Sequence, residues 1–225
     1  MTRTSHHNGE TRPGVVWVFC RHGSPLAVFF SLFLSVVAFH AVAEDAKNWT
    51  PLFNGKNLDG WKQQGAGIFK VEDGCLIGTQ TDGKGGDLFT TREFDNFECR
   101  FAYKMKWPGN SGIWFRDKYQ FDILKYQKPV AFSGSIYCPG KLFLTTNLDE
   151  NIENRHGWNE GRIFANGDHL VVWLNGKKVG DCRDNTFAKG RIGIQVHGGE
   201  NAKNMQITIQ RIEVRPLTTG EAPKD

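Results

Sequence analysis

Residues 110–124 combine strand-like alternation with side chains that suit a polyhydroxylated ligand. Successive side chains of a strand point to opposite faces, so the apolar residues of this segment fall on one face. Trp114, Arg116, Gln120 and Asp122 fall on the other face. An indole, a guanidinium, an amide and a carboxylate can together bind a sugar-like molecule. The alternative is that this is the ordinary solvated face of an antiparallel sheet.

A second alternating segment, residues 192–197, adds an acid–base candidate. Its apolar side chains alternate with Gln195 and His197, which places these two opposite the core. Histidine changes its protonation near neutral pH, so His197 is the first candidate for a catalytic base or acid. Asp122 is the rival base, or a metal ligand together with His197. A lone histidine in a strand is also commonly a structural or surface residue.

The first 43 residues are predicted to be a secretory signal peptide. Basic residues precede an apolar run from Leu26 to Phe39, and small residues follow up to Ala43, where we expect cleavage. The run is shorter and more interrupted than the ~20 residues of a membrane span, although an uncleaved anchor is the alternative. We therefore expect a periplasmic or extracellular protein with no stable membrane anchor after cleavage.

The charge of the chain argues against nucleic acid as its partner. The predicted leader holds three arginines and one glutamate, so its removal lowers the formal net charge from +4 to +2. Phosphate binding needs a clustered basic surface, and no dense run of lysine and arginine occurs. The expected partner is a small saccharide or glycoside.

Cysteine usage leaves two possibilities open. Cys20 belongs to the predicted leader, and Cys75, Cys99, Cys138 and Cys182 remain, an even number in an exported chain. Disulfides are therefore possible, with a pairing that the spacing does not fix. Buried free thiols are the alternative, because Cys99 lies within an alternating apolar run.

Short apolar runs separated by turn residues predict an all-β, two-sheet antiparallel sandwich over residues 51–216. Asp73-Gly74 and Asn175-Gly176 are strong hairpin signals. Residues 44–50 are a short linker, residues 217–225 a polar tail, residues 81–87 a plain connection and residues 125–160 the least regular part. The predicted inward-facing set is Leu76, Phe97, Phe101, Ile113, Phe115, Phe121, Ile123, Leu170, Val172, Leu174, Ile192, Ile194, Val196, Ile207 and Ile209.

Six motifs, in order from Leu52 to Gly199, resemble those of a known family: LFNGKNLDGW, FKVEDGCLIG, NSGIWFR, HGWNEGRI, HLVVWLNGKKV and GRIGIQVHGG. The chain is similar to the 3-keto-disaccharide hydrolases, or 3-keto-glucoside 1,2-lyase and 3-keto-2-hydroxyglucal hydratase domains, formerly a domain of unknown function. The resemblance covers residues 51–216. It implies a concanavalin-like jelly roll that binds sugar on the concave face of one sheet.

The chain departs from the family pattern at one place. Typical members read Tyr-Glu-x-Gln-Ile-Leu-Asp where this chain has Gln120, Asp122 and Lys125 in place of the glutamate, the glutamine and the closing aspartate. A carboxylate thus stays on the same face but moves two residues along the strand, or ~6.6 Å. This exchange leaves open either an altered substrate pose or a loss of catalysis.

The chemistry that the resemblance implies begins with a ketone at C3, which acidifies the hydrogen at C2. A base removes that proton, the enolate expels the group at C1, and water adds to the resulting enone. The residues available for this reaction are, as catalytic candidates, His197, Asp122 and Tyr137, and as substrate-binding candidates, Arg116, Trp114, Gln120, Asn159 and Gln195.

Several alternatives accompany these roles. Trp114 stacks on the sugar or packs in the core, Tyr137 donates a proton or is a buried hydrogen-bonded tyrosine, and Trp158 is predicted to be structural with Asn159 as the polar contact. A divalent metal could polarise the keto oxygen, but the sequence holds no compact ligand motif. The alternative functions are a non-catalytic carbohydrate-binding module and a purely structural sandwich, because fold does not fix function.

Overall fold

The computed structural model describes residues 48–224, which form two eight-stranded antiparallel sheets. One sheet has the order β14 (Lys177–Arg183), β13 (His169–Leu174), β12 (Asn159–Asn166), β6 (Phe97–Lys106), β16 (Gln206–Pro216), β4 (Cys75–Thr79) and β3 (Ile68–Glu72), with β1 (Thr50–Pro51) beside β16. The other has the order β11 (Leu142–Asn147), β10 (Val130–Cys138), β8 (Tyr119–Ile123), β7 (Ser111–Phe115), β15 (Gly190–Val196), β5 (Gly86–Phe94) and β2 (Trp61–Gly65), with β9 (Lys125–Gln127) beside β10.

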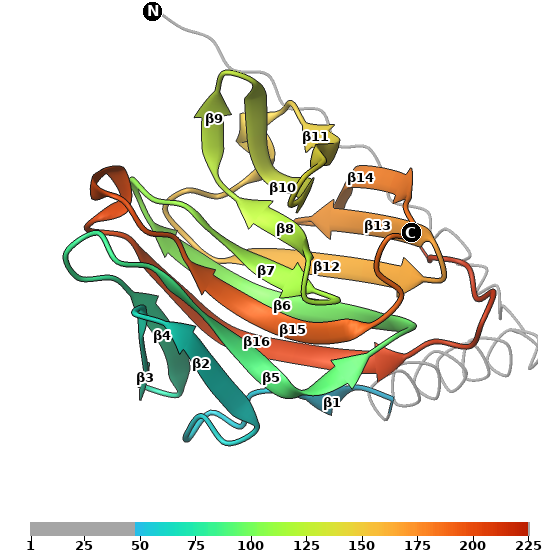
Figure 1. Ribbon diagram of the computed structural model, residues 1–225, viewed down its shortest axis with the longest axis horizontal. Helices are drawn as coiled ribbons and strands as arrows, with labels where there is room; N and C mark the ends of the chain where they lie inside the picture. The colour runs from blue at the N-terminus through green and yellow to red at the C-terminus, as the bar shows by residue number, and fades with distance from the viewer. Residues whose placement is uncertain (1–47, 225) are drawn as a thin grey trace, which may run out of the picture. The chain divides into compact units, whose positions relative to one another are not determined.

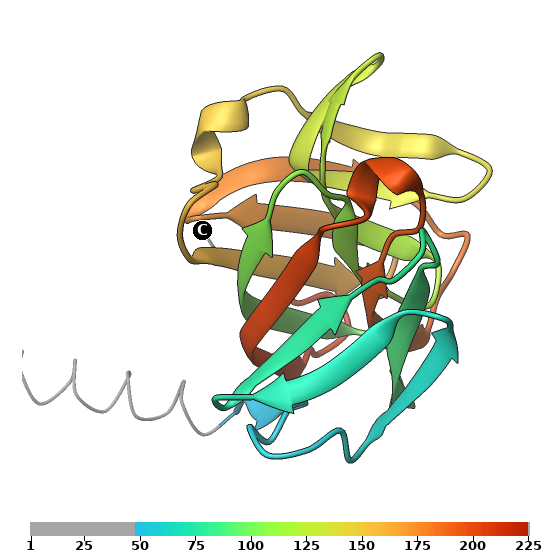
Figure 2. The ribbon, with the colours of Figure 1, turned by 90° about the vertical axis from the view of Figure 1, so that its left-hand side faces the viewer.

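The two sheets pack face to face as a sandwich. In Figure 1, β7 and β15 of the second sheet lie in front of β6 and β16 of the first, and Figure 2 shows the layers from the side. Two single-turn 3₁₀ helices, η1 (Glu150–Ile152) and η2 (Glu200–Ala202), are the only helices among residues 48–224. Neither has the length or hydropathy needed to cross a membrane. The prediction of an all-β two-sheet sandwich is confirmed.

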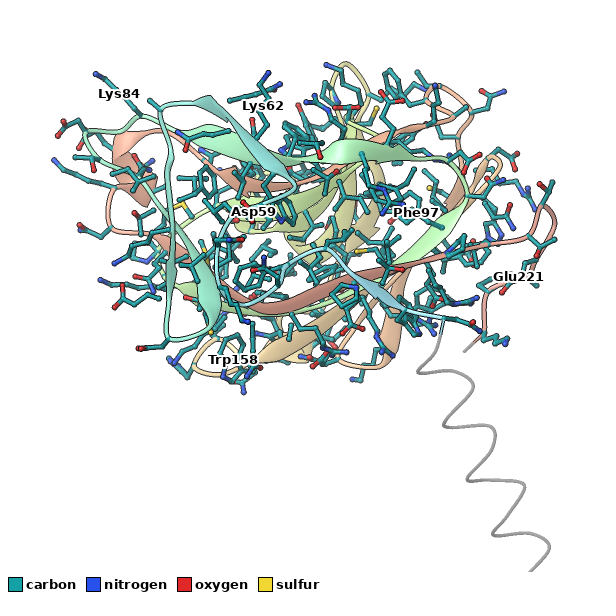
Figure 3. The ribbon with its side chains drawn as sticks, turned by 90° about the horizontal axis from the view of Figure 1, so that it is seen from below. Asp59, Lys62, Lys84, Phe97, Trp158 and Glu221 are labelled. Carbon is teal, nitrogen blue, oxygen red and sulfur yellow. The ribbon has the colours of Figure 1, made fainter. Side chains whose placement is uncertain are left out.

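The core lies between the sheets. All fifteen residues predicted to face inward are buried in one apolar cluster. Phe101 of β6 and Phe121 of β8 meet across the sandwich edge to face, with ring centroids 5.2 Å apart, and Figure 3 shows Phe97 within the interior. Because burying each such side chain contributes roughly 1.5–3 kcal/mol, alternation along the strands is sufficient to fix which face turns inward.

Truncating a core side chain should destabilise the fold. Phe101→Ala is expected to lower the free energy of unfolding by roughly 3–5 kcal/mol, because the side chain is fully buried and leaves a cavity. Urea unfolding followed by tryptophan fluorescence measures this change. Ile68→Ala, at an edge-strand residue that is 45% exposed, is the control and should stay within ~0.5 kcal/mol of the original protein. Equal stability of the two variants would contradict this packing.

Both predicted hairpins are present. Glu72 pairs with Cys75 across Asp73-Gly74, and Leu174 pairs with Lys177 across Asn175-Gly176. Asp73 and Asn175 both have a φ of +50°, the left-handed conformation that two-residue hairpin turns require and that these residue types tolerate. The Asp-Gly and Asn-Gly pairs therefore predicted both hairpin turns correctly.

The interpretation of residues 125–160 as largely irregular is wrong, since most of this segment forms β9, β10, β11 and η1. The alternation of β10 is interrupted by Ser133-Gly134-Ser135, where its pairing with β11 shifts register. Serine hydroxyls replace strand-to-strand bonds there: Ser133 Oγ accepts from the backbone N of Leu124 at 3.1 Å. This bulged strand does not show period-two hydropathy, which is why the sequence pattern hid it.

The structure describes the C-terminal tail but not the predicted leader. The predicted signal peptide, residues 1–43, lies outside the described residues. The polar tail is anchored, since Leu217 is buried and Asn166 donates hydrogen bonds to the carbonyl oxygens of Thr218 and Glu221. The four described cysteines are free thiols, which agrees with the buried-thiol alternative for Cys99.

Candidate functional site

A hollow of about 350 Å³ opens on the outward face of the sheet that contains β7, β8, β10 and β15. We call it the Asp122 hollow. Its lining consists of Asn110, Trp114, Gln120, Asp122, Tyr126, Tyr137, Pro139, Leu142, Phe143, Gln195 and His197. Six of the eight residues predicted for the site therefore meet in one cavity, and Arg116 and Asn159 do not.

Strand register explains why these distant residues converge. Asp122 on β8 lies opposite Gly112 on β7, which lies opposite Gln195 on β15. Residues directly opposite in an antiparallel sheet point to the same face. Gly112 makes room for the Gln120 side chain, since a Cβ there would lie 2.6 Å from Cδ of Gln120. The side chains of Asp122 and Gln195 thus flank Gly112, over which the Gln120 side chain lies.

A second row of cross-strand neighbours forms the aromatic side of the hollow. Tyr137 on β10 lies opposite Gln120, and Gln120 lies opposite Trp114. The rings of Trp114 and Tyr137 are 6.4 Å apart, and Phe143 packs edge to face on Tyr137 at 6.2 Å. The hollow therefore has one apolar side formed by ring faces and one polar side formed by the row of Asp122 and Gln195. This combination suits a ligand with both C–H faces and hydroxyl groups.

Three buried polar atoms in the Asp122 hollow have no hydrogen-bond partner among the described residues: Nε2 of Gln120, Oε1 of Gln195 and Oδ1 of Asn110. Leaving a buried donor or acceptor unpaired costs roughly 1–3 kcal/mol. One donor and two acceptors without partners in one cavity point to a ligand that both accepts and donates hydrogen bonds. A sugar hydroxyl does both.

Asp122 is almost inaccessible to solvent. Its side chain is only 4% exposed and it makes no hydrogen bond to any described residue. Burial alone raises the pKa of Asp122 well above its usual range, which favours the neutral carboxylic acid. A neutral acid donates a hydrogen bond or a proton, so the electrostatics favour Asp122 as an acid over the predicted role of rival base.

His197 lies at the rim of the hollow, immediately after β15, and its side chain is exposed. Its Nδ1 lies 2.5 Å from the carbonyl oxygen of Gly198. A carbonyl oxygen only accepts hydrogen bonds, so Nδ1 carries a proton, and in the neutral ring Nε2 holds the lone pair. The imidazole is thereby oriented with Nε2 as the available basic atom.

The Gly-rich connection 81–87 does more than join two strands, because it packs against the backbone that carries His197. Gly199 N donates to Gly83 O at 2.8 Å, and Gln80 Nε2 donates to His197 O at 2.8 Å. A Cβ at Gly85 would lie 2.4 Å from the backbone N of Gly198. The interpretation of this segment as a plain connection is therefore incomplete, since only glycine permits the approach that fixes the His197 loop.

Asp87 is a functional candidate that the sequence reasoning missed. It lies opposite Gln195 in β5, and its Oδ1 accepts a hydrogen bond from Trp114 Nε1 at 2.6 Å. Burial raises the pKa of Asp87, while the Trp114 bond and the charge of His197 lower it. Because this bond occupies the indole N–H, Trp114 offers the ligand its ring face. Asn110, Tyr126 and Phe143 were also missed, since no pattern marks them before the register is known.

Arg116 corrects the prediction that it binds substrate. Its side chain is 1% exposed, and its guanidinium donates to the carbonyl oxygens of Asp95, Gly167 and Phe187. Strand β7 ends at Phe115, and Arg116 has a φ of +50°, so the alternation that predicted its face does not extend to it. Arg116 holds three connections together and does not line the Asp122 hollow.

Asn159 corrects the second prediction, because it belongs to β12 in the other sheet. It is 2% exposed, its Oδ1 accepts from Asn154 N at 2.7 Å, and its Nδ2 donates to Asn154 O at 2.9 Å. Asn159 is thus structural, whereas its neighbour Trp158 is 43% exposed. The prediction that Asn159 contacts substrate is therefore wrong, and Trp158 does not line the Asp122 hollow.

The donors of the Asp122 hollow do not fit a tightly held metal ion. Over residues 48–224, no three His, Cys, Asp or Glu side chains cluster closely enough to coordinate one. The neutral form of Asp122 that burial favours is also a poor ligand, since coordination requires the carboxylate. The possibility of a metal bound by Asp122 and His197 gains no support from this arrangement.

Two antiparallel sheets packed face to face, with an aromatic and polar hollow on the outward face of one of them, define a jelly-roll sandwich. Residues 48–215 match the 3-keto-alpha-glucoside-1,2-lyase-like domain, and the chain belongs to this family. A curated relative, the 3-keto-disaccharide hydrolase of Bacteroides thetaiotaomicron, is 33% identical over 184 residues, which are 72% of this chain and 58% of the relative. The chain thus spans less than two thirds of that protein.

Solved structures support the fold. A protein of Parabacteroides distasonis, described as a candidate glycosyl hydrolase, superimposes with a TM-score of 0.61 at 18% identity, over 78% of this chain and 97% of that one. A Bacillus subtilis protein with a galectin-like fold gives a TM-score of 0.56 at 13% identity, over 75% of this chain and 94% of that one. The jelly-roll class predicted from the motifs is confirmed.

Proposed function

We propose that the protein is a carbohydrate-active enzyme that cleaves 3-keto-glycosides by elimination and hydration in the Asp122 hollow. The observation that carries this proposal is the meeting of an imidazole, a buried carboxyl group and unpaired amide atoms in one cavity. The family and the curated relative support the substrate class. A carbohydrate ligand also suits the ring faces of Trp114 and Tyr137.

In the proposed reaction, Nε2 of His197 takes the proton from C2 of the sugar, and the electron pair forms an enolate with its charge on the C3 oxygen. The free Nε2 hydrogens of Gln120 offer a hydrogen bond to that oxygen. The enolate then expels the group at C1, and Asp122 or Tyr137 protonates the departing oxygen. Addition of water gives the C1 hydroxyl and returns a hydrogen to C2, so the net change is hydrolysis.

The test incubates the purified protein with a methyl 3-keto-glucoside in D₂O and follows the products by NMR. Elimination followed by hydration predicts release of methanol and one deuterium at C2 of the product, and no reaction of the unoxidised methyl glucoside. Substrate incubated without protein controls for spontaneous exchange. Cleavage without deuterium at C2 would indicate direct displacement, and binding without cleavage would indicate a carbohydrate-binding module.

The exchange at positions 120 and 122 supplies a paired prediction. Gln120→Glu is expected to lower kcat/KM at least ~10-fold, or ~1.4 kcal/mol, because it replaces the free amide donor and adds a second acid beside Asp122. The double variant Gln120→Glu/Asp122→Gln keeps one acid in the hollow and restores the family order. It should therefore be more active than the single variant when both are assayed on the same 3-keto-glucoside.

An additive loss in the double variant, equal to the product of the two single losses, would contradict the idea that the acid has moved along the strand. Asp122→Gln alone completes the cycle. The comparison depends on the interaction between neighbouring sites and not on either loss by itself.

We further propose that the protein is exported, from the order of basic, apolar and small residues in the first 43 positions. N-terminal sequencing of material recovered outside the cytoplasm should begin at Glu44. Material that begins at Met1 would contradict cleavage.

A further inference from the structure

A second hollow, of about 670 Å³, lies on the outward face of the opposite sheet. We call it the Trp158 hollow. Tyr103 and Met105 of β6 are part of the core, so the alternate residues Lys104 and Lys106 point away from it, toward this hollow. The candidate site described above faces outward from the other sheet, so the two hollows share no lining residue and lie on opposite faces of the sandwich.

The lining of the Trp158 hollow is cationic. Lys104, Lys106 and Arg155 contribute positive charge to it, and no aspartate or glutamate lines it. Neither lysine forms an ion pair within residues 48–224. The rest of this sheet face behaves differently, because its arginines are paired with carboxylates: Arg100 with Glu213, Arg211 with Glu160, and Arg215 with Glu98. The two lysines of the hollow thus differ from these arginines, because no carboxylate of the described residues offsets their charge.

Two indoles accompany these cations. Trp158 is 43% exposed, a large apolar area for a surface residue, and Figure 3 shows it at the periphery of the fold. The Arg155 guanidinium lies over the Trp107 ring, 4.5 Å from the ring centroid. The buried Nε1 of Trp107 has no hydrogen-bond partner among the described residues. An exposed ring face and an unpaired N–H are features that a ligand with C–H faces and hydroxyl groups would satisfy.

Arg155 lies beside a buried acidic residue, Glu153. Its Nη2 lies 3.9 Å from Oε2 of the buried Glu153, and neither atom has a hydrogen-bond partner among the described residues. Glu153 in turn accepts a hydrogen bond from Tyr103 at 3.0 Å. Stacking on Trp107 therefore positions the guanidinium, whose Nη2 is left without a hydrogen-bond partner among the described residues.

We propose that the Trp158 hollow binds an anionic saccharide, one that carries carboxylate or sulfate groups. The exposed Trp158 indole provides the sugar-binding surface, and the unpaired lysines and Arg155 provide the charge selection. A nucleic acid fits less well, because a confined hollow beside paired carboxylates does not offer the extended basic stripe that a phosphate backbone requires. This binding does not depend on the proposed cleavage reaction, since the two hollows have separate linings.

The test measures binding by calorimetry for trigalacturonate, a sulfated carrageenan tetrasaccharide and neutral maltotriose. At least one acidic saccharide should bind at least ~10-fold more tightly than maltotriose, and its affinity should fall as salt is added. Comparison of the two acidic probes identifies carboxylate or sulfate as the preferred group. Trp158→Ala should weaken the binding at least ~10-fold and remove any accompanying tryptophan fluorescence change.

The charge variant is Lys104→Gln/Lys106→Gln, which changes exposed residues only and should also weaken binding at least ~10-fold and reduce its salt dependence. The control Lys56→Gln/Lys62→Gln removes the same charge at exposed sites elsewhere and should change affinity less than twofold. Cleavage of the 3-keto-glucoside should stay unchanged in both. Equal binding of maltotriose, no acidic saccharide binding tighter than ~1 mM, equal loss in the control, or tighter binding of a single-stranded oligonucleotide would each overturn the proposal.

Discussion

Replacing His197 by alanine is expected to lower kcat for 3-keto-glucoside cleavage by roughly 10²–10⁴-fold, the usual contribution of a positioned general base. The imidazole is the group in the Asp122 hollow whose free nitrogen is oriented by a hydrogen bond, from Nδ1 to the carbonyl oxygen of Gly198. Its removal should also abolish deuterium incorporation at C2 of the sugar. KM should change little, because proton removal occurs in the transition state and not on binding.

The fold should tolerate this change, since the His197 side chain is exposed and packs in no core cluster. His169→Ala is the matched control, because His169 lies on the other sheet and bonds Asp181 outside the hollow. Added imidazole should restore part of the activity of His197→Ala, whereas His169→Ala should have the original activity without it. A rate within threefold of the original protein would exclude His197 as the base.

The fold was predictable from the sequence because two local signals agreed over most of the chain. Period-two alternation identified a buried face in each long strand, and Asp-Gly and Asn-Gly pairs identified the turns that permit left-handed backbone. Strand β10 escaped prediction because its serines replace backbone partners through their hydroxyls, which interrupts the alternation. Hydropathy alone does not detect a strand whose hydrogen bonds are made by side chains.

The candidate site was predictable wherever alternation held, and failed where the strand ended or the sheet was unknown. Gln120, Asp122 and Gln195 were assigned correctly to an outward face, because they lie within regular strands. Arg116 lies one residue beyond its strand. Asn159 alternates correctly but belongs to the opposite sheet, a fact of topology that no local pattern contains.

Asp87 shows the remaining limit. Its place beside Gln195 depends on the pairing of β5 with β15, two strands that are about a hundred residues apart in the chain. The sequence offered only a Gly-rich stretch before it. Pairing between distant strands is decided by the whole sandwich, so residues that meet only through register are found once the sheets are known.

Replacing Asp122 by asparagine is expected to lower kcat roughly 10²–10³-fold and, at neutral pH, to stabilise the fold. Asparagine keeps the shape and the hydrogen-bonding capacity of the side chain but has no proton to give to the leaving group. Burial raises the pKa of Asp122 in the folded protein, so below the usual carboxyl pKa of ~4 the side chain is neutral in both the folded and the unfolded chain. As pH rises above this value, the unfolded chain loses its proton first.

The sign of the pH effect follows from this difference. Between the unfolded and the folded pKa, the original protein loses up to ~1.4 kcal/mol of stability for each pH unit, because the folded state retains a proton that the unfolded state releases. Asp122→Asn lacks this loss. Urea unfolding should therefore give similar stabilities for the two proteins near pH 4 and a more stable variant at pH 7.

Asp59→Asn is the control, because Asp59 is an exposed residue and the same chemical change there should alter neither the activity nor the pH dependence of unfolding. The combination of lost activity with gained stability is the informative result, since a merely structural aspartate would lose both or neither. Full activity of Asp122→Asn would leave Tyr137 as the proton donor. A variant less stable than the original protein at pH 7 would mean that the carboxylate is ionised and paired, contrary to the dry environment of the hollow.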